Sequence, residues 1–113
     1  MNLEPLKKKY VALLQNPLEK NKGEIDLPLR VDIYNRPRQL VCFEHGKKAI
    51  TEYEQVNHSK KGARVEFFPI TGRTHQLRVH SAHKSGLNNP ILGDSLYGTS
   101  NQRLYLHATM LVF

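Results

Sequence analysis

The shortness of its apolar runs constrains the fold of this chain more than any other feature. Runs such as VALLQ, LVCF and VEFF are far shorter than the roughly 20 apolar residues that cross a bilayer as a helix. The chain has 113 residues, which is the length of one ordinary domain. We therefore predict a single domain over residues 1–113, built from short elements and without a membrane-spanning segment.

The first third of the sequence predicts short extended pieces separated by turns. Residues 2–9, which end in three consecutive lysines, are predicted to be a linker or the tail of a helix. Residues 10–15 predict a strand, because they are mostly apolar and an Asn-Pro pair follows them. Residues 16–39 contain three prolines and predict a long irregular connection, with a short extended piece at 24–29.

Residues 48–70 predict a β-hairpin. Its first strand, 48–56, places Thr51, Tyr53 and Gln55 on one face, with Ile50, Glu52 and Glu54 on the other. Residues 57–62 predict a polar turn, and residues 63–70 predict the return strand.

One helix and a last strand complete the prediction. Residues 74–85 predict a short helix, with Thr74 as its N-cap and Gly86 in the left-handed conformation that ends it. Residues 104–113 are almost continuously apolar, which predicts a strand in the centre of the sheet. The fold class is therefore predicted as α+β, a mostly antiparallel mixed β-sheet with a short helix packed on it.

The net charge is the first indication of function. The chain has 17 Lys and Arg against 10 Asp and Glu, a formal charge of +7. Such a field attracts polyanions, and nucleic acid is the most abundant of them. A membrane surface is the competing interpretation, but the sequence has no Trp and no basic amphipathic helix. A purely solubilising charge is the other alternative.

The single cysteine, Cys42, excludes an intrachain disulfide scaffold and fits a reducing cytoplasm. Its apolar neighbours predict a small core residue. The first ten residues lack the apolar stretch of a signal peptide, which agrees with a cytoplasmic location.

The densest group of chemically active side chains lies in residues 71–80, TGRTHQLRVH. This segment joins the predicted return strand to the predicted helix, where the free N–H groups of a helix start favour anions. Arg73 precedes that start and Arg78 lies one turn into the helix. A rigidly held guanidinium there can pair with a carboxylate or a phosphate. A solvated helix surface with ordinary arginines is the alternative.

The histidines raise the question of a metal site. His75 and His80 lie about 140° apart around a helix, whereas zinc ligands on helices favour the i, i+4 spacing. His80 and His83 could share a face, but no cysteine or carboxylate completes the set. We predict no metal site, and expect these imidazoles to bond neighbouring groups or to reach phosphate.

Two other residues have open interpretations. Tyr10 follows the three lysines. In such an arrangement the aromatic ring can stack on an unpaired base while the basic side chains hold the backbone of the nucleic acid. A tyrosine packed on one face at the start of a strand fits equally well. Asp94, in the segment LGDSLYG, could pair with a helix arginine or cap a turn. As a lone catalytic carboxylate it would need a partner that the spacing does not show.

The segment PITGRTHQLRVH, residues 69–80, resembles the signature of RluA-type RNA pseudouridine synthases. Further matches follow the order of that family over almost the whole chain: Lys8-x-Tyr10-x-Ala12, Arg36-Pro37, Gly46-Lys47 with Ala49 and Thr51, Pro90-Ile91-x-Gly93-Asp94-x-x-Tyr97-Gly98, and Arg103-Leu104-x-Leu106-His107-Ala108. The resemblance implies an enzyme that flips a uridine out of ribosomal or transfer RNA, detaches its base at N1, rotates it and rejoins it through C5. It implies no metal and no organic cofactor.

The resemblance also assigns site residues. Tyr10 matches the position that stacks on the target base and helps to remove the C5 proton. Arg78 matches the position that pairs with the catalytic aspartate and keeps it ionised, and Leu77 matches the apolar wall beside it. The residues expected to contact RNA are Lys8, Lys9, Arg73, His75 and Gln76.

One departure from the family pattern concerns the catalytic aspartate. In the family it lies in a His-Arg-Leu-Asp segment before the Lys-x-Tyr strand. The aspartates of this chain are Asp26, Asp32 and Asp94, and none follows His-Arg-Leu. The chain is therefore expected to be the C-terminal part of a pseudouridine synthase catalytic domain, an expressed fragment or the product of a truncated gene, and to be inactive alone.

Two alternatives to that interpretation remain. The chain could be a non-catalytic RNA-binding module that uses the same surface, or a regulatory or protein-interaction domain whose basic charge is incidental. Salt-dependent RNA binding would distinguish the synthase fragment and the RNA-binding module from the regulatory or protein-interaction domain.

Overall fold

The computed structural model describes residues 7–59, 62–98 and 103–111. Five strands form the main sheet in the order β2-β5-β6-β1-β7, and two more form a separate ribbon. The elements are β1 (Lys7–Leu14), β2 (Lys22–Asp26), β3 (Leu29–Val31), β4 (Gln39–Val41), β5 (Ile50–Ser59), β6 (Gly62–Pro69), α1 (Gln76–Ala82) and β7 (Leu106–Leu111).

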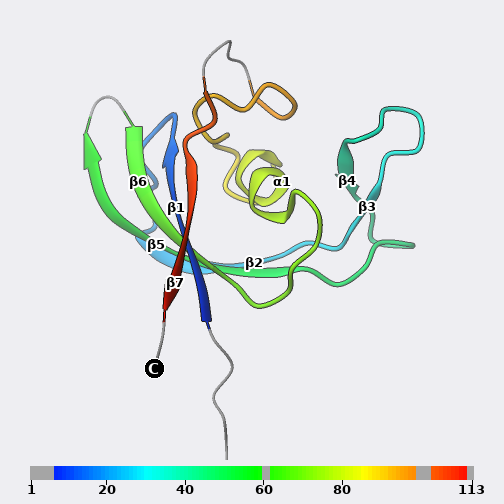
Figure 1. Ribbon diagram of the computed structural model, residues 1–113, viewed down its shortest axis with the longest axis horizontal. Helices are drawn as coiled ribbons and strands as arrows, with labels where there is room; N and C mark the ends of the chain where they lie inside the picture. The colour runs from blue at the N-terminus through cyan, green and yellow to red at the C-terminus, as the bar shows by residue number, and fades with distance from the viewer. Residues whose placement is uncertain (1–6, 60–61, 99–102, 112–113) are drawn as a thin grey trace, which may run out of the picture.

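Every strand pairing among the described residues is antiparallel. Figure 1 shows the sheet curving around α1, with the β3–β4 ribbon on the far side of the helix. These observations confirm the predicted α+β class, a mostly antiparallel sheet with one short helix. Within the described ranges, no helix has both the length and the apolar character that crossing a membrane requires.

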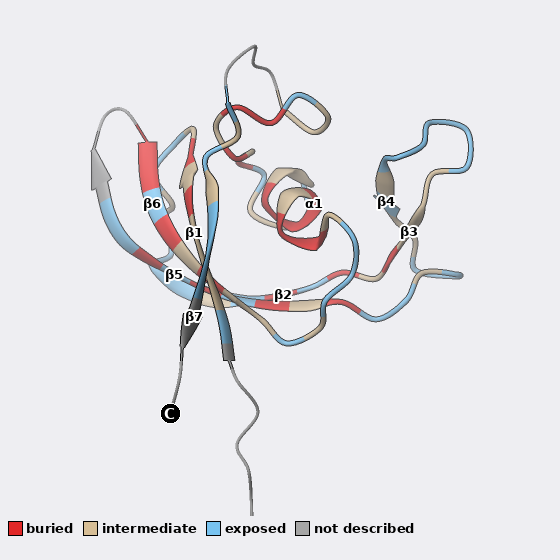
Figure 2. Ribbon diagram, viewed as in Figure 1, coloured by how far each residue is buried: buried red, intermediate tan, exposed pale blue. Residues whose placement is uncertain are grey.

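The core lies between the concave face of the sheet and α1. Alternate residues of β1 and β6 point toward the helix, so Ala12, Leu14, Val65 and Phe67 are almost fully buried, together with Leu77 of α1. Figure 2 shows this buried stripe along β1, β6 and the inner side of α1. Burying each large apolar side chain stabilises the fold by roughly 1.5–3 kcal/mol.

The predicted faces of the hairpin are confirmed. Thr51, Tyr53 and Gln55 of β5 are buried, whereas Glu52 and Glu54 are exposed. The predicted turn at 57–62 was too long, because β5 continues through Ser59 after an irregularity in its register between Gln55 and Asn57. Residues 57–59 remain in the strand because their backbone pairs with β6, and their polar side chains gave no indication of this pairing.

The helix is shorter than the predicted 74–85, and both predicted ends were wrong. Its N-cap is His75, in the left-handed conformation with φ 55° and ψ 17°, rather than Thr74. After the helix, Asn88 has the positive φ, and Gly86 does not. Gly86 instead allows close packing, since a Cβ there would collide with the carbonyl oxygen of His80.

The last strand lies at the outside of the described sheet, so its predicted central position was wrong. β7 pairs with β1 alone among the described strands, and its residues His107, Ala108 and Thr109 are exposed. Apolar composition indicated burial on both faces, but it carries no information on which strand becomes the neighbour.

Three other predictions from the N-terminal half need correction. The lysines at 7–9 belong to strand β1 rather than to a linker, because each of them pairs with a residue of β7. The region 16–39 is less irregular than predicted, since it contains β2 and β3. Cys42 is only half-buried, directly after β4 and beside the exposed Phe43, so it is not a core residue.

Candidate active site

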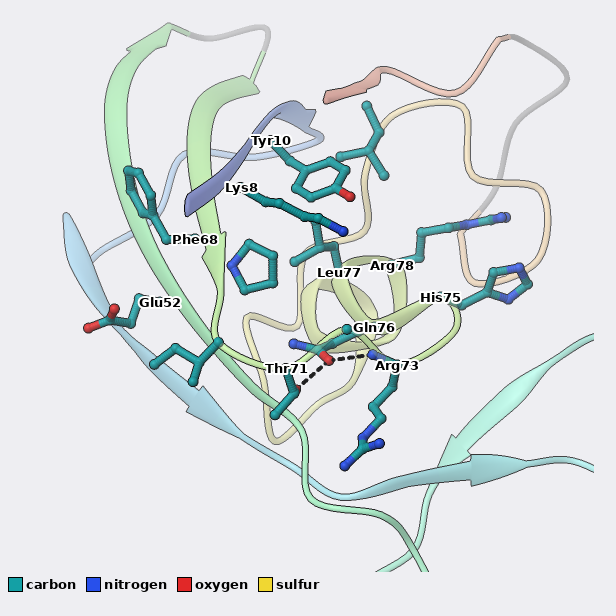
Figure 3. A pocket seen from close by; sticks show the side chains of 14 residues that line it. Lys8, Tyr10, Glu52, Phe68, Thr71, Arg73, His75, Gln76, Leu77 and Arg78 are labelled. Atoms are coloured by element: carbon teal, nitrogen blue, oxygen red, sulfur yellow. Dashed lines mark hydrogen bonds between the residues drawn. The ribbon is translucent and has the colours of Figure 1, made fainter. Parts of the chain in front are cut away.

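A cavity of about 710 Å³ opens between the concave face of the sheet and the start of α1. Strand β1 supplies one wall, the ends of β5 and β6 supply another, and the turn before α1 with its first residues closes the third (Figure 3). The lining residues are Lys8, Tyr10, Glu52, Phe68, Pro69, Ile70, Thr71, Gly72, Arg73, His75, Gln76, Leu77, Arg78 and Leu106.

Tyr10 of β1 and Leu77 of α1 form an apolar part of the cavity lining. Tyr10 pairs with Phe67 of β6 and with Ala108 of β7, so its backbone is held between two strands. Leu77 is 7% exposed and belongs to the core cluster against which Tyr10 packs. A planar aromatic ring held this way is suited to stacking on a planar ligand.

Arg78 is held in the cavity wall by a carboxylate. Its Nε donates to Oδ2 of Asp94 at 3.0 Å, and its Nη2 donates to Oδ1 at 2.7 Å. Such a bidentate pair fixes the plane of the guanidinium and leaves other N–H donors available. The side chain of Asp94 is fully buried and that of Arg78 is 17% exposed.

Asp94 also organises the loop that follows it. Its Oδ1 accepts the backbone N–H groups of Leu96 and Tyr97 at 3.0 and 3.1 Å. Burial by itself raises the pKa of Asp94, but the hydrogen bonds from Arg78 and from the two N–H groups outweigh it and hold the pKa below its ordinary value. Both predicted alternatives for Asp94, pairing with a helix arginine and capping a turn, are therefore confirmed.

Tyr97 connects this ion pair to the β3–β4 ribbon. Its hydroxyl accepts the backbone N–H of Gln39 at 2.8 Å and bonds Nδ1 of His75 at 2.8 Å. The guanidinium groups of Arg38 and Arg78 lie 5.2 and 5.4 Å from its ring centroid, within the range of cation–π contacts. Burial raises the pKa of Tyr97, so the phenol stays neutral.

Gln76 holds the turn before α1. Its Oε1 accepts the hydroxyl of Thr71 and the N–H of Arg73, and its Nε2 donates to the carbonyl of Ile50 and to Oγ1 of Thr51. The side chain is buried and its amide makes these four bonds inside the protein. Although Gln76 borders the cavity, this geometry gives it a scaffolding task, so we do not retain it among the RNA contacts.

The structure brings some of the predicted RNA-contacting residues together and separates others. Lys8 lies on the same face of β1 as Tyr10 and extends along the cavity (Figure 3). Lys9 lies on the opposite face and pairs with Glu66 at 3.2 Å. His75 is engaged by Tyr97. Arg73 is directed away from Tyr10 and Arg78, and its Nε donates to the carbonyl of Lys48 at 2.8 Å.

His80 is buried behind the site in a chain of hydrogen bonds. Its Nε2 lies 2.9 Å from the carbonyl oxygen of Leu27, so this nitrogen donates, and its Nδ1 lies 2.9 Å from Oγ1 of Thr51. Because Thr51 accepts from Gln76, its hydroxyl proton is free to bond Nδ1. Burial lowers the pKa of His80, although the Leu27 carbonyl opposes this, so the imidazole is neutral in the folded state.

This arrangement predicts a loss of stability in mild acid. The unfolded chain protonates His80 near the ordinary pKa of about 6.5, while the folded chain resists protonation, so stability falls as the pH drops below that value. We expect His80→Asn to lose roughly 1–3 kcal/mol at pH 7.5 and to show a flatter decline between pH 7.5 and pH 5. Urea unfolding across this range measures both effects.

The matched control is His45→Gln, because His45 is highly exposed. That variant should retain the whole decline. A decline in the His80→Asn variant as steep as in the wild type would contradict the assignment. Part of the slope should remain in any case, since burial also lowers the pKa of His75 and His83.

Sequence reasoning missed two features of the site. Tyr97 was noticed only as part of a matching motif, and nothing local predicted that its hydroxyl reaches His75 and Gln39, residues distant in the chain. The hydrogen-bonded partners of His80 were equally hidden. The predicted behaviour of the imidazoles, bonding to neighbours, is confirmed for His75, His80 and His83. The described residues contain no group of three or more His, Cys, Asp or Glu placed to hold a metal ion.

Comparisons with known proteins place this geometry in a family. A sequence profile described as RNA pseudouridylate synthase matches residues 2–83. The chain is 47% identical over 113 residues to the dual-specificity RNA pseudouridine synthase RluA of Pasteurella multocida (strain Pm70), covering 95% of this chain and 50% of that protein. It is 49% identical over 111 residues to the protein of the same name from Escherichia coli (strain K12), covering 93% and 49%.

A solved structure supports the same relationship. The human RNA pseudouridylate synthase domain containing 1 matches with a TM-score of 0.79 at 28% identity, over 91% of this chain and 47% of that one. The chain thus spans about half the length of these relatives. The profile covers well over half of its residues, including every described lining residue of the cavity except Leu106. The chain belongs to the RNA pseudouridylate synthase family.

Proposed function

We propose that this chain forms part of the active site of an RNA pseudouridine synthase, an isomerase that converts uridine to pseudouridine within ribosomal or transfer RNA in the cytoplasm. The observation that carries the proposal is the single cavity that Tyr10, Leu77 and Arg78 all line. In the reaction the N1–C1′ bond breaks, the uracil turns, a C5–C1′ bond forms, the C5 proton is lost and N1 takes up a proton, so the product is an isomer of the substrate and no oxidant is needed.

Each of the three residues has a task that its position permits. Tyr10 presents a ring held by its strand neighbours and stacks on the flipped uracil, which offsets part of the few kcal/mol that unstacking costs. Leu77 keeps that part of the cavity apolar. Arg78, fixed in its plane by Asp94, directs its remaining N–H donors toward a catalytic carboxylate and favours its ionised form.

The catalytic carboxylate itself must come from outside the set of aspartates in this chain. Asp94 is fully buried and bonded to Arg78, and neither Asp26 nor Asp32 borders the cavity. Glu52 is the one carboxylate among the described lining residues, and it lies at the end opposite the Arg78 guanidinium (Figure 3). Among the described lining residues, no free carboxylate therefore lies beside the Arg78 guanidinium to act as the nucleophile that covalent attack on the nucleotide would require.

We expect the 113-residue chain alone to form no pseudouridine, whereas a protein that joins it to a His-Arg-Leu-Asp segment should form it. The test incubates each with C5-tritiated uridine in ribosomal and transfer RNA, and measures tritium released to water. Release by the chain alone above a no-protein control would show that the chain has its own nucleophile. No release by the longer protein on any of these RNAs would contradict the proposed function.

A further inference from the structure

A second cavity, of about 700 Å³, meets the candidate active site at the turn before α1. Gly72 and Arg73 line both cavities. The second one is enclosed by the β3–β4 ribbon, by the segment that follows it and by this turn. Its lining residues are Leu29, Arg30, Val31, Gln39, His45, Lys47, Gly72, Arg73 and Thr74. Nothing in the proposed reaction uses this space.

The lining of the second cavity is positively charged. Arg30, Lys47 and Arg73 are its cations, and none of its described lining residues is acidic. Among the described residues, the ion pairs of the protein involve none of these three. Glu44, which pairs with His45 at 3.8 Å, is highly exposed and does not line the cavity. A cavity with this lining favours an anion with several charges over a neutral ligand.

The cations are held on ordered backbone rather than on a flexible tail. Arg30 is in the middle of β3, paired with Leu40 of β4, and is only partly exposed. Lys47 exchanges two backbone hydrogen bonds with Leu29, at 2.7 and 2.9 Å. The Nε bond of Arg73 to the Lys48 carbonyl fixes that guanidinium between the two cavities. Guanidinium groups fixed in this way suit the bidentate recognition of phosphate.

Gly72 is an independent indication of a ligand. A Cβ built on Gly72 would meet no atom within 4 Å from any residue other than its two chain neighbours, and Gly72 does not have a positive φ. Neither crowding nor backbone conformation therefore requires a glycine at this position. A glycine without such a need, at the border between two cavities, fits the close approach of another molecule's backbone.

We propose that the RNA strand adjoining the target uridine passes over Gly72 from the active-site cavity into the second cavity, where Arg30, Lys47 and Arg73 bind its phosphates. The occupant is single-stranded, because a cavity of this size admits on the order of one or two nucleotides and not a duplex. This inference rests on the proposed function for the position of the uridine. The binding of phosphates in the second cavity can be measured without turnover.

The test compares two double variants of the longer protein that contains this chain and its nucleophile segment. Arg30→Gln with Lys47→Gln removes two cavity cations. Lys20→Gln with Lys84→Gln removes two exposed cations that line neither cavity. Dissociation constants for a uridine-containing RNA stem–loop are measured over a range of KCl concentrations. Thermal unfolding verifies that all variants are folded.

We expect the cavity variant to bind about tenfold more weakly at 0.1 M KCl and to reduce the log–log salt slope by about 1.4, since each single-strand phosphate contributes about 0.7. The control variant should keep a slope near that of the wild type. Gly72→Val should weaken binding without changing the slope or the unfolding temperature, because it obstructs the strand but removes no charge.

Each contrary result has a distinct meaning. Equal salt slopes of RNA binding for the two double variants would overturn the proposal that the second cavity binds phosphates. The proposed function would stand in that case, provided that the protein forms pseudouridine. If the salt slopes are as expected but the protein forms no pseudouridine, the phosphate-binding proposal would be supported and the proposed function would be contradicted. Binding to poly-glutamate is measured on the same variants. If the cavity variant binds RNA as the wild type does but no longer binds poly-glutamate, the cavity serves an acidic peptide and the proposal is overturned.

Discussion

Replacing Asp94 with asparagine should lower the free energy of unfolding by about 2–4 kcal/mol at pH 7. The carboxylate is fully buried and forms a bidentate pair with Arg78, so its removal leaves a mostly buried guanidinium without its partner. Asparagine can still accept the N–H groups of Leu96 and Tyr97 through its oxygen, so the variant keeps the turn while removing the charge and the acceptor of the Arg78 Nε–H. Urea unfolding of the wild type and the variant measures the difference.

The effect should depend on pH in a defined direction. Because the folded-state pKa of Asp94 lies below its ordinary value, the pair stabilises the protein above the unfolded pKa of about 3.9 and this contribution is lost as the pH falls further. The difference between wild type and variant should therefore be constant from pH 5 to pH 7 and should shrink below about pH 4. Asp26→Asn, at an exposed position on β2, is the matched control and should be nearly neutral.

A double-mutant cycle tests whether the two charges act together. Arg78→Gln alone leaves a buried carboxylate, so it should also be strongly destabilising, whereas the double variant should be more stable than the sum of the single changes allows. An Asp94→Asn variant as stable as the wild type at pH 7 would show that the ion pair does not hold this loop on α1.

The second large effect concerns turnover. In the longer protein, Arg78→Gln should lower kcat for pseudouridine formation by at least about 100-fold, the magnitude typical of losing one preorganised electrostatic group. The tritium-release assay measures it. Arg64→Gln removes an exposed arginine of β6 that lines neither cavity, and this control should retain activity.

Loss of stability could imitate loss of catalysis, and the Arg78→Gln, Asp94→Asn double variant separates the two. It removes both buried charges and should recover part of the stability that either single change costs. Its kcat should nevertheless stay as low as that of Arg78→Gln, because the cavity still lacks its guanidinium. A double variant that recovers turnover together with stability would contradict a direct role for Arg78.

Local sequence was sufficient for the parts of the protein that depend on short-range patterns. The alternation in residues 50–55 predicted which side chains of β5 are buried, because successive strand residues point to opposite faces. The segment TGRTHQLR predicted a strand-to-helix junction that presents arginines. The LGDSLYG segment allowed Asp94 both kinds of interaction that it makes, since aspartate in a glycine-flanked loop caps turns and attracts arginine.

Predictions failed where the outcome depends on residues distant in the chain. The N-cap moved from Thr74 to His75 because Thr71 and Gln76 both form hydrogen bonds with Ile50 at the start of β5 and draw the turn toward the sheet. The helix ended earlier than its pattern suggested, and Gly86 proved to be a packing requirement rather than a left-handed cap. β7 is apolar but lies outside β1, since composition does not select a neighbouring strand.

For the site, the sequence by itself determined the resemblance to a family, and the tertiary structure decided which groups share a cavity. The matching motifs indicated Tyr10, Leu77 and Arg78, whereas spacing alone left Tyr10 equally open to a packing role on its strand. Only the fold placed Lys8 beside Tyr10 and sent Lys9 to the opposite face, where it meets Glu66. Only the fold placed Arg73 at the border of the two cavities and near Lys47, which lines the second. The proximity of these side chains arises from strand pairing and helix packing between segments that no local pattern connects.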